Sequence, residues 1–272
     1  WYNKEMFKKQ GVEVPATWDD FKAVCKKFID AGIKPIGTSV KDTWVLAMLH
    51  DGLALKSAGA DKVTKALTKQ GQSYNDPDFV KAANCIKELV DMGAFIDGAT
   101  GLSNDEASAS FYAEQVPMYF TGSWMGGSIV TDAEKPDNFA VAPIPVVNSK
   151  NASVTDFMGG GSDTLMVSAN TKNKDLAAAA AFEITRGVSK HAYLSGAGIP
   201  AWTVDYDASS VPALTQQVAD IAGKATSYTL WFDTLMSSDD AGEYLTLLQS
   251  LFAGDLKPEE FAASMDKQLS KK

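Results

Sequence analysis

Arginine is almost absent from this 272-residue sequence, in which Arg186 is the only example and the other basic residues are all lysines. Because bidentate recognition of carboxylates and phosphates usually relies on the guanidinium group, this scarcity favours a neutral ligand over an anionic one. The formal net charge of −9 also argues against a nucleic-acid surface, since phosphate binding needs clustered basic side chains. We therefore expect no nucleic-acid partner.

Histidine and cysteine are also scarce, with two residues of each. His50 and His191 stand at no metal-ligand spacing, and we interpret His50 as a helix-surface or hydrogen-bonded side chain rather than a base. Cys25 and Cys85 lie in separate helical patterns without a CxxC motif, so two buried thiols are favoured over a disulfide. The sequence thus predicts no metal and no cofactor.

Long apolar runs and catalytic motifs are missing as well. No apolar run reaches the length of about 18 residues that a membrane-spanning helix needs. The triple glycine at 159–161 precedes an expected strand, whereas a phosphate loop follows one, so a nucleotide site is not predicted. The carboxylate pairs lie at expected helix N-termini, where their negative charge interacts favourably with the helix dipole. Nothing here requires an enzyme, although a carboxylate pair acting on a glycoside stays an alternative.

The pattern that is present alternates between helix and strand signals and predicts an α/β fold in which helices outnumber strands. Expected helices cover 3–10, 18–31, 44–55, 61–69, 78–92, 104–114, 175–186, 213–223, 239–252 and 258–269. Expected strands cover 34–40, 117–120, 139–143 and 164–168. The alanine-rich helix at 175–186 is expected to pack closely against a sheet or another helix.

Tryptophans stand at the boundaries between these elements. In the stretch VPMYFTGSWMGG at 116–127, a short strand breaks at Thr121 to Ser123, and Ser123 is expected to cap a helix that starts with Trp124. Trp44 follows another expected strand, and Trp231 lies in an extended segment before a helix. Such indoles either fill gaps in the core or offer a flat face to a ligand ring. The stretch at 116–127 alone leaves both interpretations open.

Several motifs occur in an order that is typical of one family. They are WYNKEMFKKQGVEVPATWDDFKAVCKKFIDAGIKPIG at the start, then QVPMYFTGSW, FMGGGSDTLMVSANTKNKDLAAAAAFEI and FAGDLKPEEFAASMDKQL. Together they resemble the extracellular solute-binding proteins of ABC importers, and most closely the sugar-binding members. The resemblance extends over essentially the whole chain.

This resemblance implies a type II periplasmic-binding-protein fold, whose two lobes close on a ligand in the cleft between them. It implies a non-enzymatic receptor that captures a neutral sugar or oligosaccharide and delivers it to the membrane subunits of an ABC permease. Trp124 is expected to stack on a sugar ring. The ligand-binding residues implied in this way are Asp42, Trp44, Trp124, Gly160, Gly161, Ser162, Asp163 and Trp231.

The resemblance also implies lobe boundaries and a location. One lobe is expected to comprise 1–157 with 228–272, while 158–227 would be part of a first lobe that is incomplete because the family's N-terminal third is absent. The protein is expected outside the cytoplasm as a monomer, either periplasmic or held on the outer face of the cell membrane by a lipid anchor outside this chain. A sugar sensor for a signalling partner would share the same cleft and stays an alternative.

Overall fold

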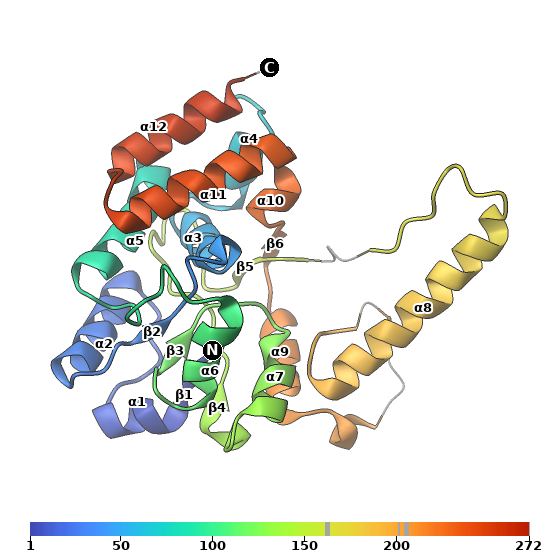
Figure 1. Cartoon of the computed structure of the whole chain (residues 1–272), viewed down its shortest axis with the longest axis horizontal. Helices are drawn as coiled ribbons and strands as arrows, with labels where there is room; N and C mark the ends of the chain where they lie inside the picture. The colour runs from blue at the N-terminus through green and yellow to red at the C-terminus, as the bar shows by residue number, and fades with distance from the viewer. Residues whose placement is uncertain (161–163, 201, 204–206, 272) are drawn as a thin grey trace.

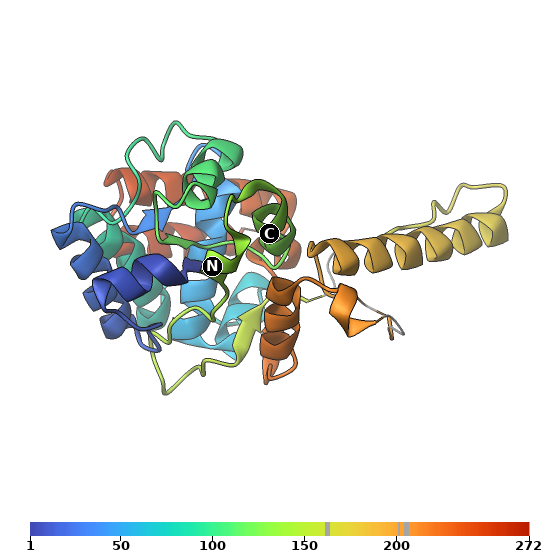
Figure 2. The same ribbon diagram turned by 90° about the horizontal axis from the view of Figure 1, so that it is seen from below.

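The computed structural model describes residues 1–160, 164–200, 202–203 and 207–271. Most elements form one body, from which the long helix α8 projects as an arm (Figures 1 and 2). The helices are α1 (Lys4–Gln10), α2 (Trp18–Asp30), α3 (Thr43–Ala58), α4 (Ala60–Leu67), α5 (Pro77–Asp91), α6 (Asn104–Tyr112), α7 (Met125–Asp132), α8 (Lys174–Ser195), α9 (Ala213–Ala222), α10 (Phe232–Leu235), α11 (Ser238–Ala253) and α12 (Pro258–Leu269). Short 3-10 turns lie at Pro136–Asn138 and Ala208–Ser210.

Two small sheets organise the body. The first has the strand order β2 (Ile36–Gly37), β3 (Met118–Tyr119), β1 (Tyr2–Asn3) and β4 (Phe139–Ala140). Strands β2 and β3 are parallel, whereas β1 is antiparallel to both of its neighbours. The second sheet pairs β5 (Asp156–Met158) with β6 (Ser227–Thr229) in parallel. Strands that lie far apart in the sequence are therefore joined at both sheets.

Helix α3 forms the centre of the helical half of the body. Its sequence is apolar on every side, and every residue of the helix except Trp44 is buried, as expected for a helix that is enclosed all round. It packs against α5, α11 and β5, while α12 covers α5 and α11. The position of α3 matters for the site because side chains along its length contact three separate parts of the chain.

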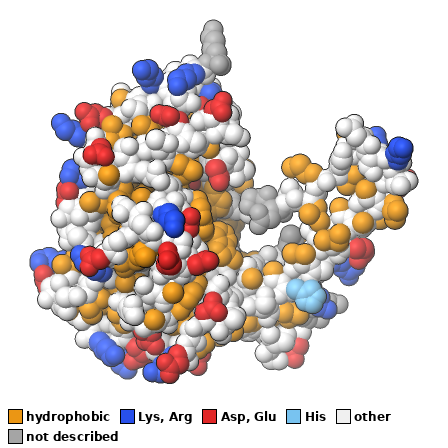
Figure 3. All heavy atoms as spheres, in the orientation of Figure 1, with side chains coloured by type: hydrophobic (Ala, Val, Ile, Leu, Met, Phe, Trp, Pro, Cys, Tyr) orange, Lys and Arg blue, Asp and Glu red, His pale blue; other side chains and the backbone are white. Residues whose placement is uncertain are grey.

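Helix α8 differs from its sequence-based expectation. The helix forms, as its alanine content predicts, but none of its residues is buried. Figure 3 shows apolar side chains along the projecting arm, and Phe182 contacts only one ring within the described chain, that of Trp202 at 4.9 Å. The prediction of close packing at 175–186 is therefore wrong for the described residues. Helix propensity is local, whereas a packing partner must come from elsewhere.

Three other expectations are corrected or confirmed. Residues 164–168 are exposed and form no strand, because no described segment pairs with them. Helix α7 begins at Met125 with Trp124 at its N-cap, so Ser123 does not cap it. Cys25 and Cys85 are free and buried, which confirms the prediction of two thiols. No helix within the described ranges is long and apolar enough to span a bilayer.

Candidate ligand-binding site

Two of the predicted ligand-binding tryptophans lie side by side. Trp44 is in the first turn of α3 and Trp124 is the N-cap of α7, and their ring centroids are 6.5 Å apart at an interplanar angle of 48°. Both indoles stay unusually open for so large an apolar side chain, with exposed fractions of 41% and 45%. Trp1 and Trp18, in contrast, are buried in the core. The paired rings therefore offer apolar surface that the chain itself leaves uncovered.

The backbone before Trp124 fixes where its ring lies. A Cβ atom at Gly122 would come within 2.1 Å of Trp124 Cζ3, so only a glycine lets the indole lie across this turn. The indole of the buried Trp1 donates a hydrogen bond to the Gly122 carbonyl at 3.0 Å. The hydroxyl of Thr121 lies 3.8 Å from the sulfur of Met48 on α3. This turn is thus held both from the sheet and from α3.

Asp42 lies beside this pair, but its carboxylate is already engaged. Its Oδ2 accepts a hydrogen bond of 2.6 Å from the backbone N–H of Asn104, one of the unpaired N–H groups in the first turn of α6. Its own N–H donates to Ser39 Oγ at 2.9 Å. Asp42 therefore joins the start of α3 to the start of α6. Asp42 thus lies near the expected site, but its carboxylate is used in a hydrogen bond within the protein.

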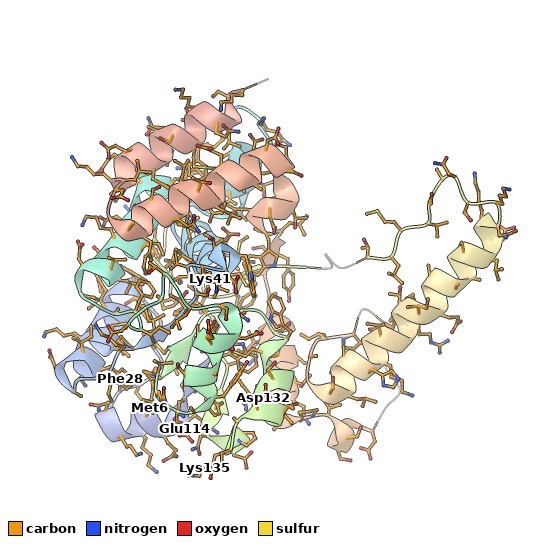
Figure 4. All side chains as sticks on the ribbon, viewed as in Figure 1. Met6, Phe28, Lys41, Glu114, Asp132 and Lys135 are labelled. Atoms are coloured by element: carbon orange, nitrogen blue, oxygen red, sulfur yellow. The ribbon has the colours of Figure 1, made fainter. Side chains whose placement is uncertain are left out.

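A groove runs from Trp124 along the space between α6 and α7. Its volume is about 540 Å³, and both apolar and polar side chains line it, among them Asn104, Asp105, Tyr112, Trp124, Ser128 and Asp132. Figure 4 places Asp132 on α7, of which it is the last residue, and Lys41 near α3. A groove with an aromatic wall at one end and several hydroxyl and carboxylate groups suits a polar ligand that carries apolar ring faces.

Trp231 lies at a second location, just after the carboxyl end of β6, which pairs in parallel with β5. It is half-buried at the N-cap of α10, and its Nε1 lies 3.8 Å from the position of a Cβ on Gly159. Gly159 and Gly160 have φ angles of 119° and 123°, which side-chain-bearing residues rarely adopt. The structure thus brings Gly160 close to the segment of Trp231. Gly161, Ser162 and Asp163, which were predicted with them, lie outside the described residues.

A buried lysine binds the loop that leads into β5. Lys56, near the end of α3, donates hydrogen bonds to the carbonyl oxygens of Ser153 at 2.8 Å, Val154 at 3.1 Å and Asp156. Burial lowers the pKa of Lys56 to about 8, against the opposing charge of Asp156. Its ammonium also lies 5.3 Å from the centroid of the Phe157 ring. The lysine therefore fixes the loop that leads into β5.

A polar cluster is buried under α10. Tyr244 on α11 donates a hydrogen bond of 2.6 Å to Asp51 Oδ1, and its oxygen lies 2.8 Å from His50 Nδ1. The other carboxylate oxygen, Asp51 Oδ2, accepts from the backbone N–H of Phe232 at 3.2 Å. Burial raises the pKa of Asp51 to about 8 and lowers that of His50 to about 3. All of these side chains are shut off from solvent, so a substrate does not reach them.

The sequence alone did not point to several of these residues. The sequence analysis did not identify Asp51, Lys56 or Tyr244. Asp51 and Tyr244 are hydrogen-bonded to each other but lie 193 residues apart in the sequence, so no local motif joins them. His50 was interpreted as a surface or hydrogen-bonded side chain, and it is hydrogen-bonded but fully buried. Among the described residues, no cluster of His, Cys, Asp and Glu could hold a metal ion.

Comparison with known proteins identifies the group to which this architecture belongs. Residues 1–182, about two thirds of the chain, match the family described as bacterial extracellular solute-binding protein. The chain belongs to this family. Its fold is the α/β periplasmic-binding-protein fold that the sequence predicted, and the proteins of the family are extracellular.

Individual members show how much of the family's length this chain represents. A solved structure from work on xylan utilization by the thermophilic bacterium Caldanaerobius polysaccharolyticus is 32% identical with a TM-score of 0.94, covering 98% of this chain and 69% of that one. A chitin oligosaccharide binding protein of known structure is 22% identical with a TM-score of 0.84, over 98% and 67% of the two chains. An uncharacterized ABC transporter extracellular-binding protein of Pyrococcus horikoshii is 28% identical over 148 residues, which are 53% of this chain and 33% of that protein. The chain thus spans about a third of the length of this curated relative.

The structure divides the predicted ligand-binding residues into two groups. Trp44, Trp124 and Asp42 gather where α3, α6 and α7 begin, whereas Trp231 and Gly160 lie where the chain crosses toward α8. Helix α3 connects them, because it carries Trp44 at one end, Asp51 in the middle and Lys56 near the other end. This helix is the shared support of the candidate site.

Proposed function

We propose that this chain is the ligand-binding part of an extracytoplasmic receptor of an ABC importer, and that it captures a neutral sugar or oligosaccharide. The observation that carries the proposal is the pair of exposed indoles, Trp44 and Trp124, with ring centroids 6.5 Å apart. The C–H faces of a sugar ring pack favourably on such aromatic surfaces, while its hydroxyls need polar partners at the edges. The groove beside Trp124 supplies such partners.

Two further observations support a sugar. Arg186, the only arginine, lies on α8 rather than beside the tryptophan pair, so no guanidinium clamp for an anion is present there. Two similar proteins also point to carbohydrates, since one comes from work on xylan utilization and another binds chitin oligosaccharide. We therefore propose a neutral oligosaccharide of this general kind as the ligand.

We also propose that the chain binds its sugar without transforming it. A glycosidase needs two carboxyl groups that face each other across an open site. Among the described residues, Asp51 is the carboxyl group whose pKa is strongly raised beside a histidine, and it is enclosed by Tyr244, His50 and Phe232 in the core. Its role is therefore structural, and the sugar would pass unchanged to a permease.

We further propose that the lobes of this receptor meet at the pair of strands β5 and β6. Residues 1–157 with 228–272 would form one lobe, and 158–227 would belong to the other. The parallel pairing of Asp156–Met158 with Ser227–Thr229 supports a two-stranded crossing at these boundaries. Packing refines these lobe boundaries. Helix α9 lies within 158–227, but its Leu214 and Val218 join the core of the main body, so α9 would belong to that body.

The function is tested by isothermal titration calorimetry with xylotriose, chitotriose and maltotriose, together with tryptophan fluorescence. We expect saturable binding of at least one sugar and a change in emission, and both should disappear in the double variant Trp44→Ala, Trp124→Ala. Val130→Ala on α7 is a matched control, because Val130 is also exposed and apolar but does not line the groove. Binding to none of these three sugars would overturn the proposal.

A further inference from the structure

Phe232, the residue after Trp231, is hydrogen-bonded to the buried carboxyl group of Asp51. The backbone N–H of Phe232 donates to Asp51 Oδ2 at 3.2 Å, and Trp231 is the N-cap of the short helix α10 that starts there. Phe232 itself is fully buried, so this bond fixes the backbone on which the half-buried indole of Trp231 stands. A change at Asp51 therefore reaches Trp231 through one residue of backbone.

We propose that Asp51 is a positioning residue for Trp231, and that the gain or loss of a proton at Asp51 changes how firmly the segment 230–232 is held for sugar binding. The part played by Trp231 in this proposal rests on the proposed sugar-binding function. The part played by Asp51 rests on the hydrogen bonds around its carboxyl group.

Among the residues that the structure describes, no positively charged group faces Asp51. Helix α12 contributes the apolar ring of Phe261 to this cluster. The titratable groups around Asp51 are His50 on its own helix, Asp233 on α10, Tyr244 on α11 and Tyr74 before α5. His50 stays neutral because burial lowers its pKa to about 3. Burial raises the pKa of Asp51 to about 8, so the carboxyl group changes its charge in mildly alkaline solution rather than in acid.

Asp51, Tyr244 and His50 can be joined by hydrogen bonds in either protonation state of Asp51. When Asp51 is ionised, it accepts from both Phe232 N–H and Tyr244 O–H, and His50 Nδ1–H donates to the Tyr244 oxygen. When Asp51 carries a proton, its O–H donates to Tyr244, whose own O–H turns to His50 Nδ1. The His50 proton then resides on Nε2, an atom with no hydrogen-bond partner among the described residues. Solvent supplies or takes up the one proton that differs.

The two arrangements hold Phe232 with different strength. An ionised carboxylate makes shorter and stronger hydrogen bonds with a backbone N–H than a neutral carboxyl group does. We therefore expect Trp231 to be held more firmly above the pKa of Asp51. Sugar affinity should rise by about fivefold between about pH 6 and about pH 9.5.

The experiment measures xylotriose affinity by calorimetry at both pH values in the wild type, in Asp51→Asn and in Asp255→Asn. The amide of Asp51→Asn reproduces the hydrogen bonds of the protonated carboxyl group, because it donates to Tyr244 and accepts from Phe232. Asp255 is an exposed carboxylate in the turn after α11 and serves as the matched control. Lys56, whose pKa is about 8, also loses its proton over this range in all three proteins, so the comparison between them isolates Asp51. We expect the ratio of the affinities at the two pH values to be about fivefold higher in the wild type and in Asp255→Asn than in Asp51→Asn. An equal ratio in Asp51→Asn and the wild type overturns the proposal.

A second measurement does not depend on any sugar. In a pH titration followed by NMR, the Phe232 amide proton of the wild type should shift downfield with a midpoint near the pKa of Asp51, as its acceptor ionises. Failure of xylotriose, chitotriose and maltotriose to bind would reject the proposed function, and the Phe232 titration would still decide the role of Asp51. A Phe232 resonance that shows no such midpoint overturns that role, even if Asp51→Asn does not fold.

Discussion

The indoles of Trp44 and Trp124 form a tilted pair at 48°, with centroids 6.5 Å apart, although they belong to different helices. This tilt prevents both faces from lying flat on one sugar ring. A bent oligosaccharide can instead place neighbouring rings on the two faces, each against one indole. For the proposed sugar ligand, this geometry fits two or more sugar units better than a single one.

Removing the exposed ring of Trp124 should affect binding more than folding. In Trp124→Ala we expect sugar binding to weaken by roughly 1 to 3 kcal/mol, because stacking surface is lost. The free energy of unfolding should change little, since 45% of this side chain is exposed. Calorimetry and urea denaturation measure the two quantities, and Trp124→Phe should recover part of the affinity. Unchanged affinity with a large loss of stability would show that Trp124 fills the core instead.

A methyl group at Gly122 should displace the ring of Trp124. The added Cβ would lie 2.1 Å from Cζ3, so Gly122→Ala must displace the indole from its present position beside Trp44. Near-ultraviolet circular dichroism should lose the signal of the coupled pair, and sugar affinity should fall toward that of Trp124→Ala. Gly242→Ala is the control, because a Cβ there meets no atom within 4 Å and alanine favours the helix. Identical spectra for Gly122→Ala and the wild type would contradict this account.

Lys56 should contribute to stability through its three carbonyl partners. Lys56→Met keeps the aliphatic stem but removes the buried ammonium that three carbonyl oxygens accept from, which should lower the free energy of unfolding by roughly 2 to 4 kcal/mol. Lys65→Met, which removes an exposed pair with Asp61, should cost less than about 1 kcal/mol. Urea denaturation compares the two, and equal losses would argue against a special role for Lys56.

Stability should depend on pH through Asp51. Its folded pKa is raised from 3.8 to about 8, so the folded protein binds an extra proton between these values. The contribution of Asp51 to the free energy of unfolding should therefore fall as the pH rises from about 4 to about 8, by about 1.4 kcal/mol for each unit of pKa difference. His50, whose folded pKa burial lowers from 6.5 to about 3, contributes the opposite slope below about pH 6.5, so the slope of Asp51 is obtained from the difference between the wild type and Asp51→Asn. In Asp51→Asn this contribution should vanish, and in Asp255→Asn it should persist. Denaturation curves at a series of pH values test the sign directly.

The two thiols should react only after unfolding. Cys25 and Cys85 are both buried and free, and burial raises the pKa of Cys25 to about 12, which suppresses the reactive thiolate. Ellman's reagent should detect no thiol in the native protein and both of them in denaturant. Rapid labelling of the native protein would mean that the helices α2 and α5, which carry these residues, open readily.

Local signals in the sequence were sufficient for most helices. Thr17 caps α2, and Ser103 with Glu106 forms a capping box at α6, because these bonds join residues only three positions apart. The strand expected at 164–168 failed for the opposite reason, since a strand needs a partner that its own residues do not supply. The position of Trp124 at the start of a helix was also readable, to within one residue.

The sequence by itself determined that the protein is an α/β chain with tryptophans at the ends of its elements, because periodicity, caps and turns act over a few residues. It also carried the motifs of a family of extracellular solute-binding proteins, which the match over 1–182 confirmed. Only the tertiary structure showed that the rings of Trp44 and Trp124 lie side by side. It also showed that the carboxylate of Asp42 accepts a hydrogen bond from the backbone N–H of Asn104. Only the structure joined Asp51 to Tyr244 and Phe232, since contacts across 193 and 181 residues depend on how whole helices pack.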